Sequence, residues 1–113
     1  TYMQQQSKKR TVPYTKMERA LLNTPSTYYT LQLMGVRTTK EITDFIQQHQ
    51  LGSEARYFHT YYLNQDWYVM VYGTYKTYED AIKASENLPA YLQAQKPWIR
   101  PMASVKKSIR LAR

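Results

Sequence analysis

Residues Trp67 to Tyr75 read Trp-Tyr-Val-Met-Val-Tyr-Gly-Thr-Tyr, and this stretch decides how the rest of the chain is interpreted. Successive side chains of a strand point to opposite faces, so a strand with one face in water should alternate apolar and polar residues. Here both alternating sets are apolar or aromatic. The stretch therefore predicts either a central strand that is buried on both faces or a strand whose second face is an exposed binding surface.

The segments on either side of this strand predict the order of the remaining elements. Residues 28–34 predict a strand that ends at Gly35, and residues 38–51 place apolar side chains at helical spacing. Residues 56–63 are β-rich and lead through a turn at 64–66 into Trp67, which predicts a hairpin. A helix follows over 77–88, and residues 97–101 can form a short edge strand between two prolines.

The resulting order, β-α-β-β-α-β, is the split βαβ arrangement of RNP-type and ferredoxin-like folds. We therefore predict an α+β fold in which a four-stranded antiparallel sheet carries helices on one face and leaves the other face open. Helices are expected to flank this unit at both ends. We divide the chain into a flexible linker (1–12), an N-terminal flanking helix (13–27), the folded domain (28–103) and a basic C-terminal helix (104–113).

The charge of the chain is distributed unevenly. The net charge is +8, which by itself would suggest binding to nucleic acid. Residues 1–27 carry +4 and residues 96–113 carry +6, whereas residues 28–95 carry −2. A sheet that binds phosphates would need the opposite distribution. The basic character therefore belongs to the flanks and not to the predicted folded core.

The residues do not form a recognisable catalytic or metal-binding set. The chain contains no Cys, which excludes disulfides, Cys-based zinc sites and cysteine nucleophiles. His49 and His59 are isolated in the sequence, and the carboxylates fall at helix starts or on helix faces. We therefore expect a protein that is not an enzyme and that needs no metal and no cofactor. Trp67 and Trp98 offer flat faces on which sugar rings or bases could stack.

Binding to RNA is the main alternative, because the RNA-recognition fold has the same element order and also places aromatic residues on its sheet. The third strand of that fold carries a run of basic, Gly and aromatic residues. The corresponding strand here, Trp67 to Gly73, has no basic residue. A protein-interaction module that uses the sheet edge or the basic terminal helix is a third possibility.

Several short motifs together resemble the SPOR domain, over about residues 28 to 103. They are Tyr29 to Leu33, Trp67 to Tyr75, Glu79 to Ala81, Leu88 to Ala90, and Gln93-Ala94 through to Pro97-Trp98. The resemblance implies a non-catalytic domain that binds peptidoglycan glycan strands lacking their stem peptides. Such strands accumulate at the division septum of bacteria, so the implied location is the periplasm.

The resemblance also implies which residues contact the glycan. In the family the glycan lies across the open sheet face, and its contacts correspond to Gln32, Trp67 and Trp98. Gly35 stands where the family commonly has Ser, and Val69 stands where some members have Arg. On this assignment Val69 and Val71 share the outward face of Trp67 and line the floor, whereas Tyr68, Met70 and Tyr72 face the helices.

The chain begins at Thr1 and not at Met, so we expect it to be part of a longer protein. Its sequence contains no run of about 18 apolar residues, and we expect no membrane contact by this segment. The implied parent is anchored in the bacterial inner membrane, and other proteins of the division machinery are possible partners.

Overall fold

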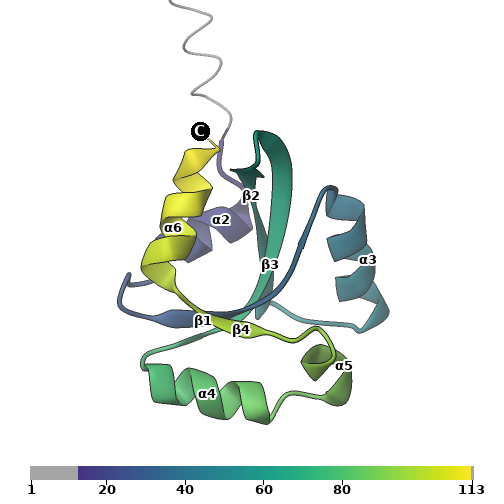
Figure 1. The fold of residues 1–113 in the computed structure, drawn as a ribbon, viewed down its shortest axis with the longest axis vertical. Coiled ribbons are helices and arrows are strands. Elements are labelled where there is room, and N and C mark those ends of the chain that lie inside the picture. Colours follow the sequence, from purple (N-terminus) through teal and green to yellow (C-terminus); the bar gives the residue numbers. More distant parts are fainter. Residues whose placement is uncertain (1–12, 113) are drawn as a thin grey trace, which may run out of the picture.

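The computed structural model describes residues 13–112, which form a four-stranded sheet with helices on both sides (Figure 1). The predicted linker at 1–12 lies outside the described residues. The elements, in chain order, are α2 (Lys16–Leu22), β1 (Tyr29–Val36), α3 (Thr39–Gln48), β2 (Ala55–Tyr62), β3 (Gln65–Tyr75), α4 (Tyr78–Glu86), α5 (Ala90–Gln93), β4 (Trp98–Pro101) and α6 (Met102–Leu111).

The sheet confirms the predicted fold class. Its strands are all antiparallel and lie in the order β2-β3-β1-β4, so the stretch Trp67 to Tyr75 belongs to a central strand, β3. On one face, α3, α4 and α5 cover a core that includes Leu31 and Leu33 of β1 and Met70 of β3. Tyr68 and Tyr72 also pack against this core. The predicted division of β3 into two faces is therefore correct.

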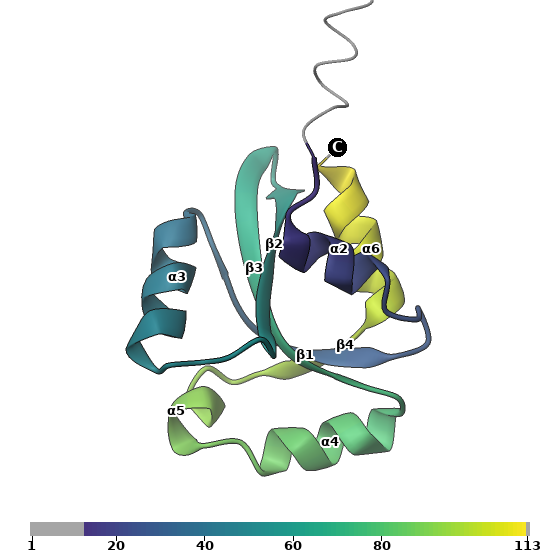
Figure 2. The same ribbon diagram turned by 180° about the vertical axis from the view of Figure 1, so that it is seen from behind.

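The second face of the sheet is partly covered by the two flanking helices, α2 and α6, which also contact each other (Figure 2). Beneath them, Phe58 of β2 and Val69 and Val71 of β3 are almost fully buried. The prediction that this face is open was wrong where these helices lie. The physical reason is that both helices carry an apolar stripe that must be buried. The buried residues that they contribute are Leu21 from α2 and Met102, Val105 and Ile109 from α6.

Helix α2 is fixed to the outer edge of the sheet by Glu18. Thr15 and Glu18 form a capping box, in which Glu18 Oε1 accepts the N–H of Thr15 at 2.9 Å. The other oxygen, Oε2, accepts the backbone N–H of His59 in the edge strand β2, also at 2.9 Å. One carboxylate therefore both begins the helix and attaches it to β2.

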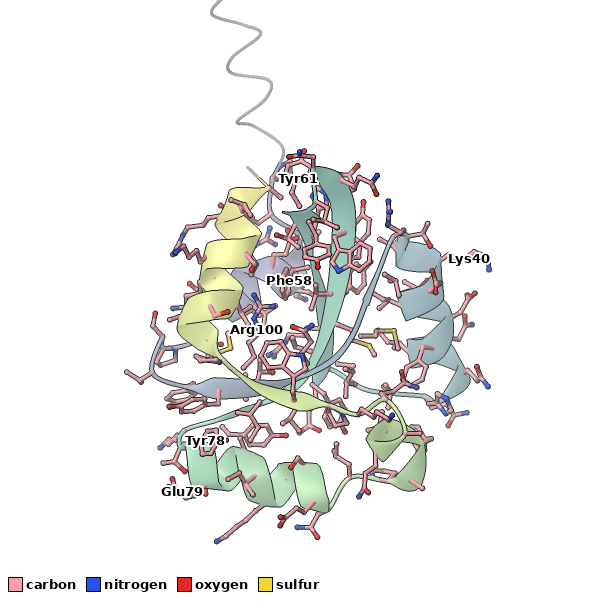
Figure 3. All side chains as sticks on the ribbon, in the orientation of Figure 1. Lys40, Phe58, Tyr61, Tyr78, Glu79 and Arg100 are labelled. Carbon is pink, nitrogen blue, oxygen red and sulfur yellow. The ribbon has the colours of Figure 1, made fainter. Side chains whose placement is uncertain are left out.

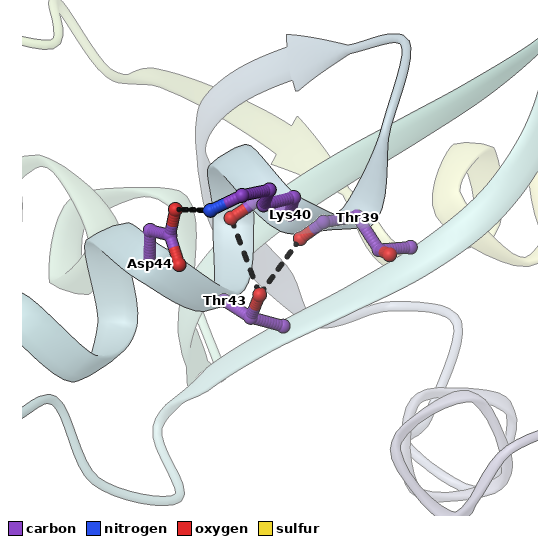
Figure 4. Close-up of polar contacts among 4 residues, drawn as sticks. All are labelled: Thr39, Lys40, Thr43 and Asp44. Carbon is purple, nitrogen blue, oxygen red and sulfur yellow. Dashed lines mark hydrogen bonds and ion pairs between the residues drawn. The ribbon is translucent and has the colours of Figure 1, made fainter.

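Helix α3 has a buried side and a polar side. Ile42 is fully buried against the sheet. On the polar side, Lys40 Nζ pairs with Asp44 Oδ2 at 2.7 Å, and the Thr43 hydroxyl donates to the carbonyls of Thr39 and Lys40 (Figure 4). Exposed pairs of this kind contribute little to stability. The helix is therefore held mainly by its apolar side.

The hairpin between β2 and β3 turns at Leu63 and Asn64, one residue earlier than predicted. Both residues have positive φ, 53° and 62°. Two successive residues in this region are typical of the tightest hairpin turns, which usually contain Asn and Gly. The Leu63 side chain is 77% exposed. Leucine is not a typical turn residue, so the sequence did not indicate that the turn begins at Leu63.

Candidate functional site

A groove of about 450 Å³ lies on the part of the second sheet face that α6 leaves uncovered. Strands from the centre and both edges of the sheet supply its floor, and one side of α6 supplies a wall. Its lining residues are Gln32, Gly35, Thr60, Tyr61, Tyr62, Trp67, Val69, Trp98, Arg100, Ser104 and Ser108. The groove is thus lined by aromatic rings, hydroxyls, one amide and one cation. None of these lining residues is acidic or a histidine.

Five of the six residues singled out in the sequence line this groove: Gln32, Gly35, Trp67, Val69 and Trp98. Strand pairing brings them together, because Gln32 of β1 lies opposite Trp98 of β4 and Gly35 lies opposite Val69 of β3. Val71 is the exception. It points to the same face, but it is only 1% exposed and packs with α2 and α6. Its predicted place on an exposed floor was wrong.

The two tryptophans differ in how they are held. Trp98 is 53% exposed and therefore offers a free ring face. Trp67 is partly buried, with the Tyr62 ring 5.4 Å from it at a 44° tilt and the Arg37 guanidinium 5.5 Å from its centroid. Packing on several sides orients Trp67 before any ligand arrives. The groove therefore contains one fixed aromatic wall and one exposed aromatic platform.

Gly35 gives the Trp67 ring its space. A Cβ atom at position 35 would lie 2.6 Å from Trp67 Nε1, closer than real contacts allow. Its backbone φ is not in the left-handed region, so the constraint is steric. The space that a side chain at position 35 would fill is therefore occupied by the Trp67 indole ring.

We expect Gly35→Ser to displace the Trp67 ring. In a Trp98→Phe background Trp67 is the only tryptophan in the chain, so its fluorescence reports its surroundings alone. The serine should shift the emission maximum and increase quenching by acrylamide. Gly52→Ser is the matched control, because nothing lies within 4 Å of a Cβ at that position. An unchanged emission spectrum in the position-35 variant would show that Trp67 does not depend on the glycine.

Arg100 is the one charged residue among the six lining residues that were not predicted from the sequence. It lies on β4, two residues after Trp98, and thus on the same face of the strand. Its Nε donates to Ser104 Oγ at 2.8 Å, and its Nη2 donates to Ser108 Oγ at 2.5 Å, both on α6. Figure 3 shows Arg100 beside Phe58, between α6 and the sheet. Burial lowers the pKa of Arg100 from its ordinary value.

Arg100 also fixes the orientation of the Gln32 side chain. Its Nη1 donates to Gln32 Oε1 at 2.8 Å. Because this oxygen accepts from Arg100, the amide group must present its two Nε2 hydrogens elsewhere. Gln32 therefore presents donors to the groove, which suits an acetamido carbonyl or a hydroxyl oxygen of a ligand.

A larger hollow of about 630 Å³ adjoins the tip of the hairpin, where Tyr61 lies beside the C-terminal end of α6 (Figure 3). It is lined by Tyr61, Leu63, Asn64 and Leu111. The described residues of its walls include no charged side chain and none of the residues singled out in the sequence. Size alone therefore does not identify the candidate site, and the smaller groove has the richer chemistry.

The described part of the chain contains neither a metal-binding cluster nor a membrane-spanning helix. Within residues 13–112, no three His, Asp or Glu side chains gather closely enough to hold a metal ion. No helix among the same residues has the length and apolar character needed to cross a membrane.

Known proteins provide an independent comparison. A family model of the SPOR domain matches residues 25–101. The chain is also 34% identical over 86 residues to the cell division protein DamX of Serratia marcescens, a match that covers 76% of this chain and 40% of the relative. The chain thus spans less than half the length of that relative. Because the family match covers most of the chain and includes every strand of the sheet, this chain belongs to the SPOR domain family.

Proposed function

We propose that this domain binds the glycan strands of peptidoglycan in the form that lacks stem peptides, without catalysing a reaction. One observation carries the proposal: Gln32, Gly35, Trp67 and Trp98, taken from three strands, line one groove. Aromatic rings suit the apolar faces of sugars, and the Gln32 amide and nearby hydroxyls suit their polar groups. The described residues that line this groove include no pair of carboxylates of the kind that cleaves glycosidic bonds.

By binding such strands, the domain would place its parent protein at the division septum, in the periplasm. The Serratia marcescens relative is a cell division protein, which supports this role. The parent is proposed to be anchored in the inner membrane, with other division proteins as further partners. The RNA alternative loses support because α2 and α6 cover part of the sheet face on which bases would stack.

The proposal predicts the effect of Trp98→Ala on glycan binding. The exposed Trp98 ring contributes little to the core, so the variant should fold normally. Its affinity for the glycan should fall by a factor of about ten or more, which is the usual cost of removing a tryptophan that dominates an interface. The measurement is sedimentation with amidase-treated and with intact sacculi. Tyr78→Ala is the control, because Tyr78 is also half exposed but lies on α4, outside the groove.

Two outcomes would contradict the proposal. If the unmodified domain sediments equally with intact and amidase-treated sacculi, it does not select strands that lack peptides. If a folded Trp98→Ala variant binds as tightly as the unmodified domain, the groove is not the binding site. A gel shift with RNA at physiological salt tests the main alternative directly.

A further inference from the structure

Among the described residues, Arg100 is a positive charge without a negative partner. In residues 13–112 the ion pairs are Lys40 with Asp44 and His59 with Asp66, and neither involves the groove. Every hydrogen bond of Arg100 goes to a neutral oxygen, from Gln32, Ser104 or Ser108. Its guanidinium has five N–H donors and makes four contacts, so at least one donor is left for a ligand.

The surroundings make this charge costly in the free protein. Arg100 is partly buried over the Phe58 ring, 5.8 Å from its centroid, and beside Trp98, 6.0 Å from its centroid. A cation removed from water is stabilised most by an anion, and neutral oxygens compensate it only in part. The same neutral contacts hold the guanidinium rigidly in the groove. The site is therefore preorganised for a negatively charged group.

The chemistry of the proposed ligand supplies such a group. In peptidoglycan the stem peptide is attached through an amide to the lactyl carboxyl of N-acetylmuramic acid. Hydrolysis of that amide releases the peptide and leaves a free carboxylate on the sugar. A strand that still carries peptides has a neutral amide carbonyl at the same atom. The negative charge on the sugar itself thus distinguishes the two forms of the strand.

We propose that Arg100 binds the free lactyl carboxylate of N-acetylmuramic acid, so that this domain selects peptide-free strands by charge. The inference rests on the proposed function, because it names the group of the glycan that the groove recognises. Steric exclusion of the peptide alone would give no role to an unpaired cation. Planar guanidinium and carboxylate groups also form paired hydrogen bonds, which adds orientation to the charge.

The test compares three oligosaccharides of equal length by calorimetry. They are a tetrasaccharide of alternating N-acetylglucosamine and N-acetylmuramic acid with free carboxylates, the same compound with both carboxylates converted to methylamides, and neutral chitotetraose. The unmodified domain should prefer the acid to its amide by about tenfold or more, as for one hydrogen-bonded charge pair. This preference should decrease as salt increases.

Variants then assign the preference to one residue. Arg100→Gln should bind the acid and the amide alike, whereas Arg100→Lys should retain part of the preference because it retains the charge. Arg110→Gln removes the same charge from an exposed position on α6, outside the groove, and should keep the full preference. Thermal unfolding checks that each variant is folded.

Each outcome has a distinct meaning. Equal binding of acid and amide by the unmodified domain would overturn the role of Arg100 and leave the proposed function standing. A folded Arg100→Gln variant that still prefers the acid would overturn the assignment to Arg100. If the unmodified domain binds none of the three compounds, the proposed function itself fails. The comparison of the acid with its amide needs no variant, so it tests whether the domain selects the free carboxylate even if Arg100→Gln does not fold.

Discussion

A chain that stops at Pro101 is expected to lose its cooperative unfolding transition. This truncation removes α6, whose residues Met102, Val105 and Ile109 are all fully buried. Burial of an apolar side chain of this size contributes ~1.5–3 kcal/mol, so the helix contributes about 5–9 kcal/mol in total. Whole domains are stable by only ~5–15 kcal/mol. The loss of α6 is therefore comparable to the whole stability.

The truncation has a second effect on the sheet. It exposes Phe58, Val69 and Val71, and it removes the carbonyl of Ser108 that accepts the Thr60 hydroxyl at 2.7 Å. The shortened chain should consequently bind a hydrophobic dye and show no sharp melting transition by circular dichroism. The control replaces Lys107 and Arg110, on the exposed side of α6, with alanine and should melt as the full chain does. A truncated chain with the original melting temperature would show that α6 is dispensable.

Phe58→Ala is expected to be the most damaging single substitution in this part of the sheet. Phe58 of β2 is fully buried beneath α6, and removal of a buried phenylalanine side chain costs ~3–5 kcal/mol. The guanidinium of Arg100 lies over the same ring. The variant should therefore lose both stability and affinity for the peptide-free glycan. Chemical denaturation and calorimetry measure the two losses separately.

The chain contains one other phenylalanine, which makes a matched control. Phe45 on α3 is only partly buried and packs against the core on the opposite face of the sheet. Phe45→Ala should destabilise the domain less and should leave glycan affinity unchanged. If Phe58→Ala does not fold, Phe58→Leu preserves most of the apolar volume and should still weaken binding. Equal losses of stability at the two positions would contradict the conclusion that Phe58 is more deeply buried than Phe45.

Much of the sheet and of the groove follows from the pattern of the sequence. The two faces of β3 were predictable because side chains alternate along a strand, and the order of elements was enough to predict the sheet. That pattern, together with the family resemblance, brought Gln32, Trp67 and Trp98 to one face. These inferences depend on local periodicity and on rules of strand pairing. They require no knowledge of how distant segments dock.

The errors arise where distant segments meet. The apolar stripe of α6 was visible in the sequence, but which surface it would cover depends on tertiary packing, and Val71 was therefore predicted as exposed. Arg100 was counted as one of several basic residues in the C-terminal flank. Its position two residues after Trp98 was the signal that would have placed it in the groove. A charge tally by segment does not show on which face of a strand a charge lies.

The contact between Glu18 and the N–H of His59 bears on how neighbouring copies of the domain behave when they are crowded. The unpaired edge of a sheet attracts the edge of another molecule, which leads to aggregation. At one edge Glu18 already occupies a donor of β2. At the other edge β4 has only four residues and ends in proline. We expect crowded copies of the domain to stay separate, because Glu18 blocks part of one edge and the strand at the other edge is short.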